Sequence, residues 1–131
     1  MGKSVSQLVK SQPQGLSSIQ ELVKEDLDLV ATELHRIVVS DFELIDQVNE
    51  HLFLTRGKLF RPTLVLLSSR VGGEASDEVL TLAAVVELVH LATLVHDDAV
   101  DHSVLRRGLP TVNASWTHQV AIIMGDYLYS R

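Results

Sequence analysis

The chain has 131 residues, a formal net charge of −6, 46% hydrophobic residues and no cysteine. This length suits one small domain, and the hydrophobic content is too high for a disordered chain. The acidic balance argues against binding to nucleic acid, and the lack of cysteine excludes disulfides and zinc–thiolate sites. The polar N-terminus lacks the apolar core of a signal peptide. We therefore expect a soluble, cytoplasmic protein without a membrane-spanning segment, because Glu87 and His90 interrupt the most apolar stretch.

The first part of the chain predicts helices with ordinary solvated faces. Residues 1–15 are polar and are expected to form a flexible arm. The segments 18–21 and 40–43 each match the capping-box pattern, so helices are predicted from these points to about Val39 and about Leu54. Neither helix carries residues that indicate chemistry.

A basic segment follows, with the sequence Arg56-Gly57-Lys58-Leu59-Phe60-Arg61-Pro62. Pro62 suits the first turn of a helix, which is predicted to stop at Gly72-Gly73. Lys58 and Arg61 would then lie at a loop-to-helix junction, where free backbone N–H groups and the helix dipole favour an anion. A plain basic linker is the alternative interpretation.

A long apolar helix is predicted next, starting after Ser76 and its two acidic neighbours. Residues 79–95 are apolar nearly all round, so this helix should be central and buried. His90 and Thr93 lie on one stripe of the helix, and this stripe leads to a group of carboxylates. We expect His90 to face the same cavity as that group, and Glu87 to make a structural hydrogen bond.

The carboxylates form the string His96-Asp97-Asp98-Ala99-Val100-Asp101, which Arg106 and Arg107 follow. In a helix, Asp97 and Asp101 share one face, with Asp98 beside them. Oxygen ligands on one face suit Mg²⁺, which keeps several waters and takes phosphate oxygens of a substrate as further ligands. Arginine can bind the same anion through two parallel hydrogen bonds. The combination indicates a Mg²⁺–diphosphate site at the mouth of an apolar pocket, although such a string alone is more often solvated charge.

After the arginines, Gly108-Leu109-Pro110 breaks the chain. The segment from Thr111 to Trp116 is expected to lead into a last helix, whose apolar residues are Val120, Ile122, Ile123, Met124 and Tyr127. This helix has no glycine, proline or polar tail to close it. The chain is therefore expected to be part of a longer protein.

Three motifs occur in a fixed order along the second half of the chain. They are Gly57-Lys58 with Arg61-Pro62, then the string from His90 to Asp101 with Arg106-Arg107-Gly108, then Gly125-Asp126-Tyr127-Leu128. In order and spacing they resemble the trans-type polyprenyl diphosphate synthases, most closely the long-chain members. The resemblance covers roughly residues 50–131. It departs at Arg56, where the family usually has glycine, and at Leu59, where it usually has a basic residue.

The resemblance implies an all-α fold, an antiparallel helical bundle of the isoprenoid synthase type around a deep cavity. Residues 1–131 would form the N-terminal part of that bundle. Asp97 and Asp101, supported by Asp98, would bind the Mg²⁺ that holds an allylic diphosphate, and Arg106 would contact the same diphosphate. The diphosphate of isopentenyl diphosphate would be held by Lys58, Arg61, His90 and Arg107.

The resemblance also implies a determinant of product length. Ala92 and Thr93 lie about one helical turn before Asp97, where a growing prenyl tail would pass. Both side chains are small, so we expect a long product, beyond the C20 class.

Members of this family are longer and carry a second aspartate-rich motif that faces the first. The chain is therefore expected to hold half an active site, to be inactive alone, and to be completed by a C-terminal half in a homo- or hetero-oligomer. Two alternatives stay open. One is a fragment of a class I terpene cyclase, against which Lys58, Arg61 and His90 argue because a cyclase holds no second diphosphate. The other is a non-catalytic helical subunit that regulates a partner.

Overall fold

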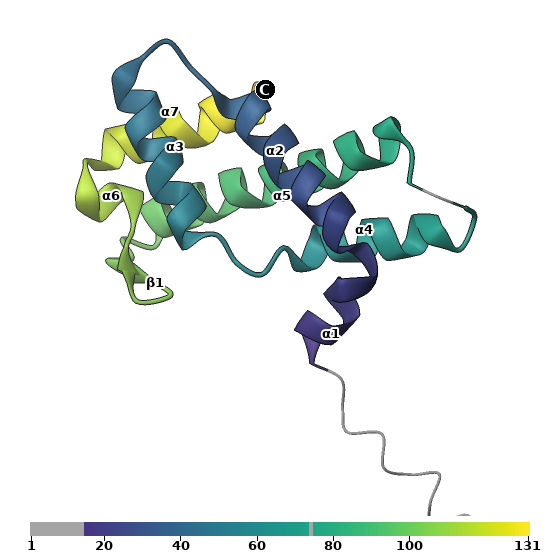
Figure 1. Ribbon diagram of the computed structural model, residues 1–131. Helices are drawn as coiled ribbons and strands as arrows, with labels where there is room; N and C mark the ends of the chain where they lie inside the picture. Colours follow the sequence, from purple (N-terminus) through teal and green to yellow (C-terminus); the bar gives the residue numbers. More distant parts are fainter. Residues whose placement is uncertain (1–14, 74) are drawn as a thin grey trace, which may run out of the picture.

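The computed structural model describes residues 15–73 and 75–131 (Figure 1). The expected flexible arm therefore lies outside the described residues, apart from Gly15. The elements are α1 (Leu16–Gln20), a 3₁₀ helix η2 (Glu21–Val23), α2 (Lys24–Val38), α3 (Glu43–Thr55), α4 (Phe60–Arg70), α5 (Asp77–Val100), β1 (Leu105–Arg106), β2 (Leu109–Pro110), α6 (Val112–Ser115) and α7 (His118–Tyr129). The expectation of an all-α fold is confirmed, since the two strands only form a short antiparallel hairpin.

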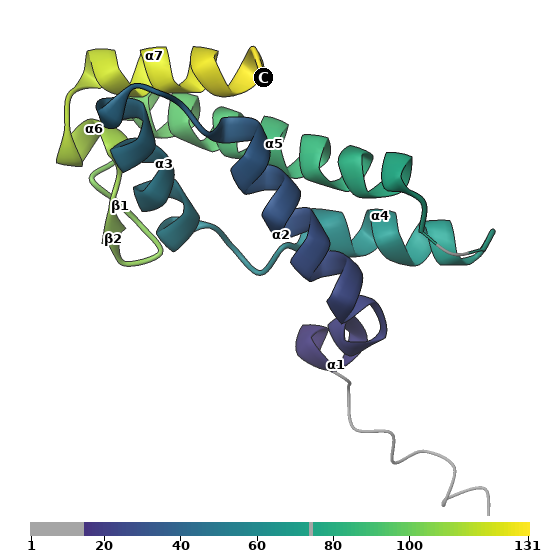
Figure 2. The same cartoon turned by 45° about the horizontal axis from the view of Figure 1, so that its top comes forward.

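Helix α5 is the axis of the fold (Figure 2). α4 lies antiparallel along its N-terminal half, α7 lies antiparallel along its C-terminal half, and α2 crosses it. On α5 itself, four alanines are at most 1% exposed, namely Ala83, Ala84, Ala92 and Ala99. Side chains this small allow neighbouring helices to approach the α5 backbone closely, which places the core around this helix.

The expectation of a helix buried all round is only half met by α5. Its apolar residues Leu82, Val85, Val89 and Val100 are 41–73% exposed. An apolar composition cannot show which faces have a partner, and no described element covers this side. By length and composition α5 could also cross a membrane, contrary to expectation, although it packs on three helices as a core helix does.

The helix starts differ from the capping-box predictions. No capping box forms at Ser18, because α1 begins earlier, at Leu16, and the 3₁₀ helix η2 then separates α1 from α2. The second start is displaced by a few residues. The backbone N–H of Ser40 donates to Asp46 Oδ1 at 3.1 Å, so Asp46 takes the role that the pattern assigned to Glu43.

Candidate diphosphate and metal site

The aspartate-rich string forms the C-terminal end of α5. Asp97 and Asp98 belong to the last turn, and Asp101 is the C-cap, whose N–H donates to the carbonyl of Asp97 at 2.8 Å. Asp97 and Asp101 are exposed, whereas Asp98 is buried. Carboxylates at this end of a helix face the negative pole of the helix dipole. The fold thus holds them in an unfavourable place that a bound cation would offset.

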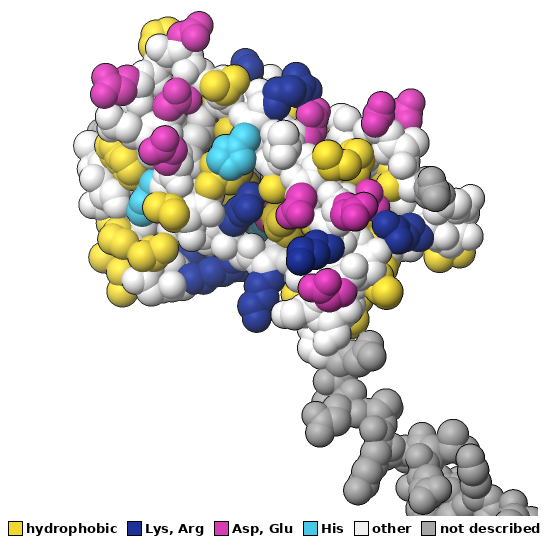
Figure 3. Space-filling view, viewed as in Figure 1, with side chains coloured by type: hydrophobic (Ala, Val, Ile, Leu, Met, Phe, Trp, Pro, Cys, Tyr) yellow, Lys and Arg dark blue, Asp and Glu magenta, His cyan; other side chains and the backbone are white. Residues whose placement is uncertain are grey.

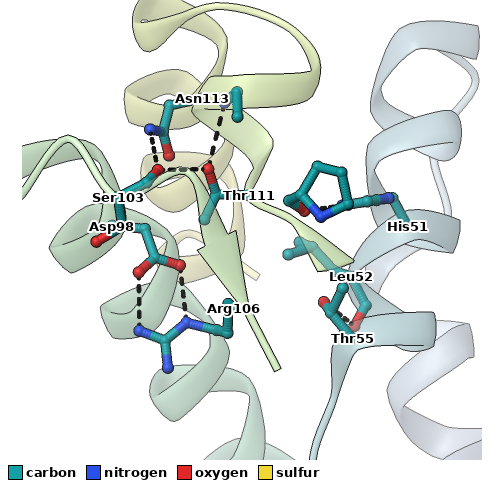
Figure 4. Close-up of polar contacts among 10 residues, drawn as sticks. His51, Leu52, Thr55, Asp98, Ser103, Arg106, Thr111 and Asn113 are labelled. Atoms are coloured by element: carbon teal, nitrogen blue, oxygen red, sulfur yellow. Dashed lines mark hydrogen bonds and ion pairs between the residues drawn. The ribbon is translucent and has the colours of Figure 1, made fainter. Parts of the chain in front are cut away.

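Asp98 is occupied by an ion pair with Arg106 (Figure 4). Arg106 donates from Nε to one carboxylate oxygen at 2.7 Å and from Nη2 to the other at 2.8 Å. This pairing raises the pKa of Arg106 above its usual value. Asp98 therefore positions Arg106, and Asp97 and Asp101 are left as the candidate oxygen ligands.

These two carboxylates fit the metal that the sequence predicts. Within residues 15–73 and 75–131, no three His, Asp or Glu side chains converge into a ready-made metal site. Mg²⁺ is commonly held by one or two carboxylates together with water and the phosphates of a substrate. Asp97 and Asp101 match that incomplete, oxygen-only ligand set.

The hairpin that carries the arginines is held from both sides (Figure 4). The carbonyl of Ser103 accepts from Thr111 Oγ1 at 2.7 Å and from Asn113 Nδ2 at 2.9 Å. On the other side, His51 Nε2 of α3 donates to the carbonyl of Pro110 at 2.7 Å. The hairpin is thereby fixed between α3 and the end of α5.

This hairpin was not predicted, because Gly108-Leu109-Pro110 indicates only a break in the chain. Arg107 has φ 51° and Gly108 has φ 78°, and two positive φ values are the signature of a type I′ two-residue turn. The signal was the glycine directly after Arg107. Because the chain reverses here, the side chains of Arg106 and Arg107 reach different parts of the molecule although the two residues are adjacent in sequence.

Arg107 reaches the loop between α3 and α4. A Cβ at Gly57 would overlap the Arg107 guanidinium, so only glycine allows this approach. Lys58, next to it, is exposed. α4 begins at Phe60, two residues before the predicted start at Pro62, and Arg61 is exposed in its first turn. The predicted loop-to-helix junction is therefore present, with the tip of the hairpin packed against it.

His90 and Glu87 face this basic group from α5. Partial burial lowers the pKa of His90, and the charges of Arg61, Arg107 and Arg106 lower it further. Burial raises the pKa of the Glu87 carboxyl, with Arg61 the largest of the opposing charges. The charges of Arg61 and Arg107 therefore act on both His90 and Glu87, which lie about one turn apart on α5.

Two residues of this group were not expected to contribute. The predicted structural hydrogen bond of Glu87 is absent from the described part of the chain, where its Oε2 is buried without a partner. Arg56 was noted only as a departure from the family pattern. Its Nη1 is also buried without a partner in this part, and its guanidinium lies 5.6 Å from the centre of the Phe53 ring. Lys and Arg side chains gather on this face of the molecule, over the loop from α3 to α4 (Figure 3).

The two residues expected to set product length differ in their surroundings. Ala92 is 0% exposed and belongs to the core. Thr93 is half-buried, and its Oγ1 lies 2.9 Å from the hydroxyl of Tyr129 on α7. A larger side chain at 92 would have to displace core residues, whereas one at 93 meets a neighbouring side chain at the surface of the helix pair.

The Gly-Asp motif of α7 packs on α5 at His96, the residue just before the aspartates. A Cβ at Gly125 would overlap the ring of His96, so the glycine allows the two helices to meet there. His96 Nε2 lies 3.1 Å from the carbonyl of Ile122 and 3.5 Å from Asp126. These contacts hold the residue that directly precedes Asp97.

The structure is thus an all-α fold with two exposed carboxylates at the end of its central helix and guanidinium groups at two neighbouring positions. The family model for polyprenyl synthetases matches residues 42–131, and the chain belongs to this family. The predicted family and the isoprenoid synthase fold are thereby confirmed.

Curated relatives are similar in sequence to this chain over most of its length. Component 2 of heptaprenyl diphosphate synthase from Bacillus subtilis is 39% identical over 106 residues, which is 81% of this chain and 30% of the relative. Octaprenyl diphosphate synthase from Escherichia coli is 36% identical over 116 residues, which is 88% of this chain and 36% of the relative. The chain therefore spans about a third of the length of the curated relatives it matches.

Solved structures agree with this assignment. A polyprenyl synthase from Caulobacter crescentus, complexed with calcium and isoprenyl diphosphate, superposes with a TM-score of 0.84 at 33% identity, over 91% of this chain and 36% of that one. A decaprenyl diphosphate synthase from Rhodobacter capsulatus gives a TM-score of 0.81 at 35% identity, over 87% of this chain and 35% of that one.

Proposed function

We propose that this chain supplies the first aspartate-rich motif and the isopentenyl diphosphate site of a trans-polyprenyl diphosphate synthase. The reaction is the Mg²⁺-dependent condensation of an allylic diphosphate with isopentenyl diphosphate, and the product is long. Membership of the polyprenyl synthetase family supports the prenyltransferase class. Relatives named heptaprenyl and octaprenyl diphosphate synthases support the long product.

The divergence of Arg106 and Arg107 is the observation that carries the proposal. Arg106 is turned to Asp98 at the metal end of α5, and Arg107 is turned to Gly57 beside Lys58. A two-substrate reaction needs two separate positions for diphosphate, and this arrangement offers one guanidinium to each. A class I terpene cyclase would need only the first position.

Each residue then has a defined task. Asp97 and Asp101 hold the metal, which when bound stabilises the charge that develops on the leaving diphosphate. Arg106, kept in place by Asp98, contacts the same diphosphate through the part of its guanidinium outside that pair. The allylic C–O bond breaks, the electron pair leaves with the diphosphate, and the alkene of isopentenyl diphosphate attacks the carbocation before a proton is lost. Charge stabilisation stronger in the transition state than in the ground state accelerates this step.

Isopentenyl diphosphate is held by the second position. Lys58, Arg61 and Arg107 supply positive charge, and His90 supplies a ring N–H. Burial and the neighbouring arginine charges lower the pKa of His90, which favours the neutral ring in the free chain, and a neutral ring can still donate its N–H to a diphosphate oxygen. An apolar cavity beyond α5 would exclude water from the carbocation.

The remaining carboxylates are expected from a C-terminal half that faces α5. Component 2 of a heptaprenyl diphosphate synthase is by its name one part of a larger enzyme, which makes a hetero-oligomer a reasonable form for this chain as well. The regulatory-subunit alternative differs from the main proposal in one respect, since it requires no diphosphate site.

The test is a pair of calorimetric titrations on the 1–131 chain, with isopentenyl diphosphate alone and with farnesyl diphosphate plus Mg²⁺. Lys58→Ala and Arg61→Ala should weaken the first affinity more than the second. Asp97→Ala with Asp101→Ala should sharply weaken the second affinity, because the metal ligands are lost, and should spare the first. Equal effects on both ligands would refute the two-site division. Binding of the allylic ligand alone would favour a cyclase, and binding of neither would favour a regulatory subunit.

Product length is predicted to depend on Thr93 more than on Ala92. In an enzyme completed by a C-terminal half, Thr93→Tyr should shorten the product, because the new ring blocks the face one turn before Asp97. Chromatography of radiolabelled products measures the distribution. Thr32→Tyr, on an exposed face of α2, is the control and should leave product length unchanged. An unchanged distribution in Thr93→Tyr would show that the tail runs elsewhere.

A further inference from the structure

Gln20, the last residue of α1, binds the loop that carries Lys58. Its Nε2 donates to the carbonyl of Lys58 at 2.5 Å and to Thr63 Oγ1 at 2.9 Å. The two acceptors lie on either side of Leu59, one before it and one in the first turn of α4. A single side chain from the N-terminal segment therefore spans the junction between the α3–α4 loop and α4.

Leu59 is the residue at this junction that most needs support. It is the N-cap of α4 and has φ 54° and ψ 40°, the left-handed backbone conformation that residues with a Cβ rarely adopt. Such a conformation persists where surrounding contacts determine it. Thr63, 1% exposed, donates from Oγ1 to the carbonyl of Leu59 at 2.8 Å. Gln20 continues this network, so the peptide groups on both sides of Leu59 are held.

The direction of Lys58 and Arg61 depends on this turn. Lys58 directly precedes Leu59, and Arg61 follows two residues later in the first turn of α4. A different backbone conformation at Leu59 would change the direction in which Lys58 leaves the loop relative to Arg61 on α4. The loop has no side-chain N-cap of its own, which leaves the contacts from Gln20 and Thr63 to hold it.

We propose that Gln20 is a positioning residue of the isopentenyl diphosphate site, acting through the Lys58 carbonyl and Thr63. This inference rests on the proposed function. Gln20 lies outside residues 42–131, to which the family model is matched, and in a segment where the sequence indicated no chemistry. The N-terminal helix thus contributes to the binding site without touching the substrate.

The experiment compares the parent chain 1–131 with Gln20→Ala, Gln20→Glu and a control. Gln20→Glu keeps the length of the side chain but removes both N–H donors. Gln47→Ala is the matched control, because Gln47 is an exposed helical glutamine whose amide bonds only to Glu43 of its own helix. Calorimetry gives the affinities for isopentenyl diphosphate and for farnesyl diphosphate with Mg²⁺, and thermal unfolding gives the stability.

Both Gln20 variants should bind isopentenyl diphosphate roughly tenfold more weakly, as expected for the loss of two hydrogen bonds that order the loop. Their affinity for farnesyl diphosphate with Mg²⁺ should stay within about twofold of the parent. A general structural role would lower both affinities and the melting temperature together, and would overturn the inference, as would an unchanged affinity for isopentenyl diphosphate. If the parent itself binds no isopentenyl diphosphate, the proposed function fails and this inference fails with it. If the parent binds and only Lys58→Ala weakens binding, the inference fails alone.

Discussion

Arg106 and Arg107 illustrate how neighbouring residues of one type acquire different tasks. A type I′ turn places Arg107 in the left-handed conformation and reverses the chain directly after Arg106. Asp98 then holds Arg106 through two hydrogen bonds, and Gly57 admits Arg107. The different positions of the two arginines therefore depend on the Asp98 carboxylate, on the turn after Arg106 and on the absence of a Cβ at Gly57.

The buried carboxyl of Glu87 is expected to make the stability of the fold depend on pH. Because burial raises the pKa of this carboxyl above its ordinary value in the folded chain, the protonated form stabilises the fold at low pH. That stability is lost as the pH rises through the raised pKa. Glu87→Gln should therefore increase the free energy of unfolding at pH 7.5, and the gain should shrink as the pH falls towards 5. Thermal unfolding at both pH values measures the effect.

Glu50→Gln, at an exposed position on α3, is the control and should show no such pH-dependent gain. A loss of stability in Glu87→Gln at pH 7.5 would mean that the charged carboxylate is held by Arg61, Arg56 and Arg107 more strongly than burial opposes it.

At the scale of the element, α5 combines a favourable start with an unfavourable end. Asp77 and Glu78 occupy its first turn, where acidic residues complement the helix dipole, while Asp97 and Asp101 lie at the opposite end. Asp97 and Asp101 are also four residues apart on one face, so they repel each other. This end of the helix is therefore less favourable than its start, and under the proposed function a bound cation would offset that cost.

The destabilising effect of the two carboxylates at the C-terminal end of α5 can be measured directly. In the absence of Mg²⁺, Asp97→Asn with Asp101→Asn should raise the free energy of unfolding by roughly 0.5–1.5 kcal/mol. Urea unfolding in the presence of a chelator checks this. Asp77→Asn, at the other end of the same helix, is the matched control and should lower stability slightly. A change of the same sign at both ends would rule out the dipole explanation.

At the scale of the whole molecule, one side of α5 is apolar and is not covered by any described element. Leu82, Val85 and Val89 form a stripe on α5, and Ile122 and Ile123 add exposed apolar surface on α7. Exposed apolar surface of this kind usually marks an interface. The stripe is therefore the surface against which a C-terminal half is expected to pack.

We predict that the isolated 1–131 chain self-associates and does not elongate an allylic primer. Under the proposed function its described carboxylates would approach the metal from one side only, so the leaving diphosphate would be half neutralised and open to water. Light scattering gives the mass in solution, and incorporation of radiolabelled isopentenyl diphosphate with Mg²⁺ gives the activity.

Leu82→Lys with Val89→Lys should reduce self-association, whereas Val71→Lys, at the exposed end of α4, should not. A monomeric parent chain that elongates the primer unaided would disprove both parts of this prediction, and a monomeric but inactive one would disprove only the association.

Local chemistry was sufficient to predict much of this protein. The apolar period of each segment and the glycines after α4 predicted the helices, because a helix depends on residues three and four apart. The order of basic, acidic and Gly-Asp motifs predicted the family, which the comparisons confirm. Capping boxes were less reliable, because at Ser18 and Ser40 other nearby groups satisfy the same backbone N–H groups.

Tertiary structure alone decided which of these residues meet. The ion pair of Asp98 with Arg106, the approach of Arg107 to Gly57 and the bonds from Gln20 to the α3–α4 loop join segments between 8 and 50 residues apart. The same holds for the burial of Glu87 and Ala92 and for the exposure of one side of α5. A sequence pattern describes which face of an element is apolar, but which partner covers that face depends on how the elements pack in space.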